Sequence, residues 1–112
     1  MTVHAVLETR TDAEVASLRA AAAAAQTAST RRRRARGDAV AAALDWVADD
    51  GPAPMSGLGV GADVEAIGFE RVRALDAERA AITSGEDGTF PGVVALTLGW
   101  FLRREHADTP LY

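Results

Sequence analysis

A proline-free stretch from Thr11 to Asp50 constrains the fold of this chain more than any other part of it. The stretch contains six consecutive alanines, Ala20 to Ala25, and alanine has the highest intrinsic helix propensity. Thr11 and Glu14 have the spacing of a capping box, in which the two side chains bind each other's backbone amides and start a helix. The stretch therefore predicts a helical arm, and the whole chain is expected to be all-α.

The arm is expected to be one long helix over about residues 12–48, with Gly37 as its kink. The alternative is two helices, because the segment 26–30 contains Ser and Thr, which compete for backbone hydrogen bonds. Asp38 is able to cap a second helix. One glycine costs only about 1 kcal/mol inside a helix, which favours continuity. A straight helix of this length would span roughly 55 Å and would need a partner to cover it.

The rest of the chain predicts a helical hairpin over about residues 63–84 and 91–106, after a loop that contains Pro52 and Pro54. The first helix has a stripe of apolar residues, interrupted by Gly68, that is expected to face the core. That stripe consists of Val64, Ile67, Val72, Leu75 and Ile82. The second helix is apolar almost all round, which predicts burial on most sides. We therefore expect three to four helices in a single domain over residues 12–112, preceded by an extended arm over residues 1–11.

The composition indicates the kind of genome that encodes the protein and the compartment in which it is expected. All twelve basic residues are arginine and there is no cysteine, so neither disulfides nor thiolate chemistry are available. The abundance of Arg, Ala and Gly indicates a GC-rich genome, either bacterial or of a phage. We see no signal peptide, and the longest apolar run, Val93 to Leu102, is too short to span a bilayer. The expected location is the cytoplasm, or the virion if a phage encodes the chain.

The most function-like feature is an arginine cluster, which consists of Arg31, Arg32, Arg33, Arg34 and Arg36. On a helix these side chains point in every direction, whereas a groove-binding helix needs one basic face. The net charge of −4 also argues against a dedicated nucleic-acid binder. We expect the cluster to be solvated or paired with acidic side chains, and phosphate binding is the alternative.

Other motifs do not point to catalysis. The segment 57–62 fits the G-x-G-x-x-A pattern of dinucleotide-binding loops, but no strand is expected before it, so a turn is favoured. His4 and His106 lie in separate terminal segments without neighbouring ligands. The acids of the helix over 63–84 point in different directions. We expect no catalytic residue, no metal, no cofactor and no small-molecule substrate.

These observations lead to one functional expectation and one alternative. We expect a non-enzymatic assembly or adaptor protein, of the phage structural or bacterial regulatory kind, that associates with itself or with a partner protein. Ala22 and Ala25 on the alanine run and Trp46 near the loop are the expected contact residues. The alternative is a nucleic-acid-associated protein that uses the arginine cluster.

Overall fold

The computed structural model describes residues 10–102, and these residues form four α-helices and no strand. The helices are α1 (Asp12–Gln26), α2 (Arg31–Asp49), α3 (Val64–Thr83) and α4 (Thr89–Leu102). The all-α prediction is confirmed, with the larger of the expected helix numbers. The expected arm over residues 1–11 lies almost entirely outside the described residues, as do residues 103–106 of the last predicted helix.

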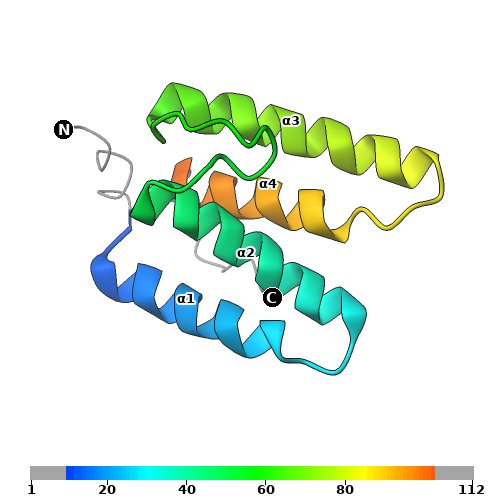
Figure 1. Ribbon diagram of the computed structural model, residues 1–112, viewed down its shortest axis with the longest axis horizontal. Helices are drawn as coiled ribbons and strands as arrows, with labels where there is room; N and C mark the ends of the chain where they lie inside the picture. The colour runs from blue at the N-terminus through cyan, green and yellow to red at the C-terminus, as the bar shows by residue number, and fades with distance from the viewer. Residues whose placement is uncertain (1–9, 103–112) are drawn as a thin grey trace.

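The helices lie side by side in the order α1, α2, α4, α3 (Figure 1), so their order in space differs from their order in the chain. Two antiparallel hairpins, α1–α2 and α3–α4, pack on each other through α2 and α4. The predicted hairpin of the second half is confirmed as α3–α4. Consequently α2 and α4 are inner helices, whereas α1 and α3 each have a neighbour on one side only.

The single long helix over 12–48 is wrong. α1 ends at Gln26, and after a short turn Thr30 caps α2 by accepting a hydrogen bond from the Arg33 amide at 3.3 Å. α2 then runs back along α1, and Asp38 accepts a hydrogen bond from the Gln26 side chain instead of capping a helix. Doubling back lets the chain bury its alanine face against itself, which the continuous helix could not do without a partner.

Gly37 is the crossing point of α1 and α2 and not a kink. A Cβ atom at Gly37 would lie 2.7 Å from the Gln26 amide nitrogen, 2.8 Å from the Ala22 carbonyl oxygen and 2.9 Å from the Ala25 Cβ. These neighbours are mostly backbone atoms, so no side-chain rotation would relieve the clash. The alanine run and Gly37 together allow the two helix axes to approach closely.

The core lies along α2 and α4. On α2 the buried residues include Val40, Leu44, Trp46 and Val47. On α4 seven of fourteen residues are buried, which confirms the prediction that this helix is covered on most sides. Arg10 joins this core from outside α1: its Nε donates to the Trp100 carbonyl at 2.8 Å and its guanidinium lies 4.4 Å from the centre of the Trp100 ring.

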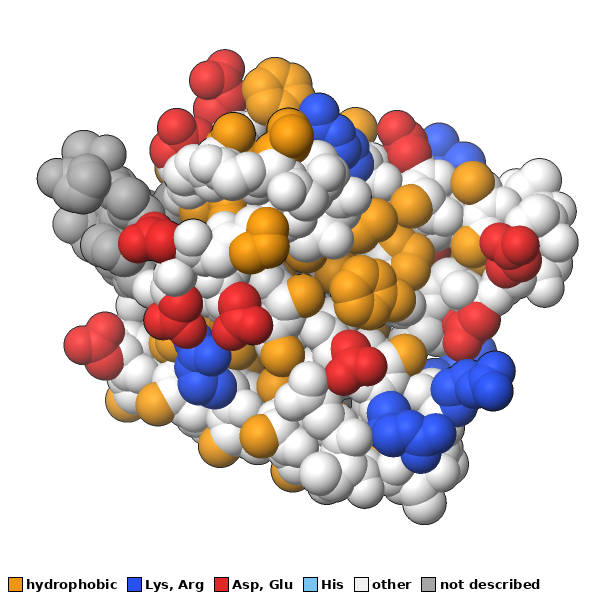
Figure 2. Space-filling view, viewed as in Figure 1, with side chains coloured by type: hydrophobic (Ala, Val, Ile, Leu, Met, Phe, Trp, Pro, Cys, Tyr) orange, Lys and Arg blue, Asp and Glu red, His pale blue; other side chains and the backbone are white. Residues whose placement is uncertain are grey.

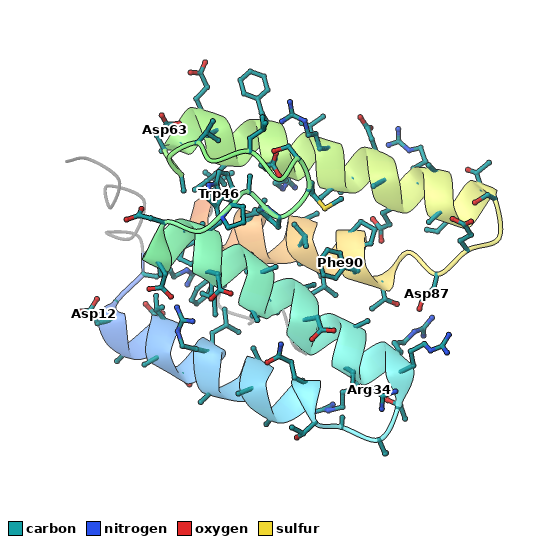
Figure 3. All side chains as sticks on the ribbon, viewed as in Figure 1. Asp12, Arg34, Trp46, Asp63, Asp87 and Phe90 are labelled. Carbon is teal, nitrogen blue, oxygen red and sulfur yellow. The ribbon has the colours of Figure 1, made fainter. Side chains whose placement is uncertain are left out.

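The loop between α2 and α3 is fixed by two buried side chains. Glu70 of α3 is buried, and its Oε1 accepts hydrogen bonds from the amides of Met55 and Ser56 at 2.8 and 3.1 Å. The Trp46 indole donates to the Val60 carbonyl at 2.8 Å, and Figure 3 shows Trp46 beneath the loop. These bonds satisfy buried polar groups that would otherwise destabilise the fold.

Candidate interaction surface

The residues expected to contact another molecule are internal in this fold. Ala22, Ala25 and Trp46 are each at most 2% exposed, the alanines against α2 and the indole beneath the loop. They offer no surface to another molecule, because the chain already uses them for its own packing. An interaction surface must therefore lie elsewhere.

The arginine cluster is partly engaged within the chain. The Arg34 guanidinium donates to the carbonyls of Ala28 and Ser29 at 2.8 and 3.0 Å, and so satisfies the turn that follows α1. Figure 3 shows Arg34 and Asp87 at the same end of the bundle. Hydrogen bonds from Thr89 lower the pKa of Asp87, and the nearby charges of Arg32 and Arg31 lower it further.

Arg36 is half-buried, so Arg31, Arg32 and Arg33 are the remaining exposed arginines of the cluster. Figure 2 shows basic side chains gathered at the end of the molecule where α2 begins. The cluster is thus divided between structural hydrogen bonds and a small basic surface.

The charges of α2 oppose its helix dipole at both ends. The first turn holds four arginines and no acid, although a helix N-terminus favours negative charge. The last turn holds aspartates and no basic residue. Arg19 of α1 compensates the C-terminal end by pairing with Asp45 at 3.4 Å and Asp49 at 2.9 Å.

Most of the apolar stripe of α3 faces solvent, and the expectation that it would face the core is confirmed only at Ile67, which is buried, and at Leu75, which is partly buried against the core. The buried residues of α3 are Ile67, Glu70 and Ala74. By contrast, Val64 is 60% exposed, Val72 54% and Ile82 65%. The buried face of α3 is thus formed by Ile67, Glu70 and Ala74, and the large side chains of the stripe lie to one side of it.

We call this surface the α3 face, and it consists of Val64, Gly68, Val72, the partly buried Leu75 and Ile82, with the exposed Arg79 inside the same arc. Counted at about 100° per residue, these positions fall within about 80° of the helix circumference. The stripe extends over roughly 27 Å at 1.5 Å per residue. Phe69, also 60% exposed, lies about 60° beyond Val72. Contiguous exposed apolar side chains of this kind are typical of docking surfaces.

Leu96 of α4 extends the α3 face. It is 57% exposed and lies one turn from both Gly92 and Gly99 on the same side of α4. A Cβ at Gly92 would contact the Glu78 carboxylate, and one at Gly99 would lie 3.4 Å from the Arg71 Nε. Leu96 therefore lies beside the edge of α3 that carries Arg71 and Glu78.

Both of these charged residues lack an ion-pair partner among the described residues. The Arg71 Nε is buried, and within residues 10–102 it has no hydrogen-bond acceptor. Glu78 forms no ion pair there, whereas two other i,i+3 pairs of α3 are present, Arg73–Glu70 at 3.2 Å and Arg79–Asp76 at 4.0 Å. One edge of the α3 face thus carries two unpaired, opposite charges two helical turns apart.

The other sequence motifs do not form a binding or metal site within the described residues. The segment 57–62 is a loop that leads into α3, with Asp63 as the helix cap, and no strand precedes it in the described part of the chain. His4 and His106 lie outside that part. Between residues 10 and 102, no cluster of three or more acidic or histidine side chains is arranged to hold a metal.

An open groove of about 530 Å³ between α1 and the end of α2 is lined mainly by alanines and by the paired Arg19.

None of the four described helices is both long enough and apolar enough to cross a membrane. Comparisons with protein families, with curated proteins and with solved structures find no match to this chain.

Proposed function

We propose that this protein is a non-enzymatic interaction module that associates with another protein surface, or with a second copy, through the α3 face. The observation that carries the proposal is the exposure of Val64, Val72 and Ile82 on an outer helix whose main helix neighbour is α4. Burial of one such side chain contributes roughly 1.5–3 kcal/mol. Several on one straight stripe supply enough free energy for a specific contact.

The experiment that tests the proposal compares Val72→Glu with Leu58→Glu. Val72 and Leu58 are both apolar and about half exposed, but Leu58 lies in the loop that packs on the opposite side of α3. Self-association is followed by light scattering, and partner proteins are identified by crosslinking in the cells that produce the chain. Val72→Glu should abolish association and Leu58→Glu should preserve it.

A thermal melt of both variants accompanies this comparison, because an exposed position should tolerate glutamate without loss of folding. Equal association of the wild type and Val72→Glu would contradict the proposal. So would a wild-type protein that neither self-associates nor crosslinks to any protein in a manner that depends on Val72.

A second candidate function is the binding of nucleic acid by Arg31, Arg32 and Arg33. It is favoured by the position of these exposed arginines at a helix N-terminus, where their repulsion with the dipole would be relieved by phosphate. Three phosphate contacts predict a salt dependence with a slope of roughly −3 on a logarithmic scale. The triple change of these arginines to glutamine should abolish that slope, and unchanged binding would exclude this function.

A further inference from the structure

We infer that the partner of the α3 face is the α3 face of a second copy, paired antiparallel about a two-fold axis between Val72 and Leu75. This inference rests on the proposed function and specifies its partner. It is argued from three properties of α3: the spacing of the apolar positions, the placement of Gly68, and the charges along both edges.

The apolar positions of the α3 face are spaced so that they match those of a second α3 that runs in the opposite direction. When two copies of α3 lie antiparallel with Val72 opposite the second copy's Leu75, Val64 falls near the second copy's Ile82. Gly68 then falls opposite Arg79, so the smallest residue of one helix faces the longest side chain of the other. Large residues opposite small ones are what close helix packing requires.

Gly68 has no packing reason among residues 10–102. A Cβ at this position would meet no atom within 4 Å, although glycine lowers helix stability relative to alanine. Gly37 shows the contrast, because three atoms lie within 3 Å of its Cβ position. An open glycine in the middle of an exposed apolar stripe is explained when a second helix crosses there.

The charged edges favour the antiparallel arrangement over the parallel one. In a two-fold antiparallel helix pair, each edge meets the same edge of the other copy with its direction reversed. Arg71 therefore meets the second copy's Glu78, and Glu78 meets Arg71, so two unpaired charges form two ion pairs. Glu65, about 20° beyond Val72 on the other edge, then lies near the second copy's Arg79, which projects from within the face. In a two-fold parallel pair each edge would instead meet the opposite edge of the other copy, which would separate Arg71 from the second copy's Glu78.

The absence of cysteine from the chain makes the register directly measurable. Val64→Cys and Ile82→Cys variants, one of them with a mass tag, are mixed and treated with a thiol crosslinker that spans about 8–10 Å, the distance between packed helices. The antiparallel pair places Val64 near the second copy's Ile82 but the two Val64 residues roughly 28 Å apart. Mixed crosslinks should therefore exceed either homo-crosslink at least tenfold.

The charge assignment is tested by reversal. Arg71→Glu should weaken dimerisation at least fivefold in sedimentation experiments, and the double variant Arg71→Glu with Glu78→Arg should restore it. A helix pair is at the small end of specific interfaces, so concentrations from about 5 to about 500 µM are needed. A double variant that dimerises no better than Arg71→Glu would overturn the assigned contact.

Two results would overturn the self-pairing. One is a monomer at every concentration, and the other is a dimer in which homo-crosslinks at position 64 equal the mixed ones. A monomer that still crosslinks to a different protein in a Val72-dependent manner would refute self-pairing alone and leave the proposed function standing. A protein that neither dimerises nor crosslinks to another protein in a Val72-dependent manner would refute both the self-pairing and the proposed function.

Discussion

At the scale of single residues, two helical glycines have opposite consequences. Gly37 lies where α1 and α2 cross, with backbone atoms of α1 at less than 3 Å from its Cβ position, whereas Gly68 faces open space. Neither the residue type nor the helical context distinguishes the two positions, and only the tertiary neighbours do. Alanine at the two positions should therefore change stability in opposite directions.

Gly37→Ala should lower the free energy of unfolding by roughly 1–3 kcal/mol, because overpacking outweighs the gain in helix propensity. Gly68→Ala should raise the monomer's unfolding free energy by up to about 1 kcal/mol. If Gly68 is a helix-crossing point between copies, the same variant should dimerise less well. Urea denaturation of both variants measures the first two effects. A more stable Gly37→Ala would contradict the assignment of Gly37, and a less stable Gly68→Ala monomer would contradict that of Gly68.

The buried carboxylate of Glu70 is a second residue-scale feature. Glu70→Gln keeps an oxygen acceptor for the amides of Met55 and Ser56 but removes the charge that strengthens these bonds and the pair with Arg73. The expected loss is about 1–2 kcal/mol, with faster hydrogen exchange at the Met55 and Ser56 amides. Glu86→Gln in the exposed turn after α3 should leave both measurements unchanged. Unaltered exchange in Glu70→Gln would show that the loop is held by other contacts.

At the scale of helices, the two helix starts of the first hairpin differ in one position. Thr11 and Glu14 form both hydrogen bonds of a capping box, at 3.0 and 2.8 Å. Thr30 forms only the first of the two bonds, because Arg33 occupies the position of the glutamate. The N-terminus of α2 is therefore the less stable helix start, and it is open to improvement.

Arg33→Glu should complete a second capping box and place a negative charge at the positive end of the dipole. We expect a gain of roughly 0.5–1.5 kcal/mol in unfolding free energy. The melting temperature should be higher than that of the wild type, and added salt should reduce this difference. Arg33→Gln separates the removal of positive charge from the gain of a negative one. A destabilised Arg33→Glu would mean that Arg33 has a structural contact in the fold.

The capping box of α1 should also respond to pH. The hydrogen bond from the Thr11 amide is the main cause that lowers the pKa of Glu14 from its ordinary value of 4.5, and the charge of Arg10 contributes. A depressed pKa in the folded state means that this contribution is present above pH 4.5 and is lost as the pH falls through the lower, folded-state value. An NMR titration should place the Glu14 midpoint below 4.5 and show the first turn of α1 changing with it. A midpoint at or above 4.5 would contradict the box in solution.

The sequence predicted helix starts better than helix packing. The box at Thr11 and the helix start near residue 63 depend on local hydrogen bonds, and both are found in the structure. Helix propensity alone favours continuity over the break after Gln26, because it does not include the free energy gained when α2 packs on α1. The direction of the α3 stripe is also not predictable, since the charged residue Glu70 lies on the buried face of α3 together with Ile67 and Ala74.

At the scale of the whole molecule, the order α1, α2, α4, α3 predicts a gradient of stability. The inner helices α2 and α4 have packed neighbours on both sides, whereas α1 and α3 have one each. Hydrogen exchange should therefore be slowest in α2 and α4 and faster in α1 and α3. If α3 pairs with a second copy, its protection should rise with protein concentration while that of α1 stays constant. Uniform protection of all four helices would contradict this gradient.

The arrangement of the helices also has a consequence during synthesis. α3 leaves the ribosome before α4, although α4 is the helix on which α3 packs. Until residues 89–102 emerge, the nascent chain holds a completed α1–α2 hairpin beside a helix exposed on all sides, including the stripe that remains exposed in the mature fold. Transiently exposed apolar surface favours aggregation and chaperone capture. The late nascent chain, rather than the finished protein, is therefore the form in which this fold is most vulnerable.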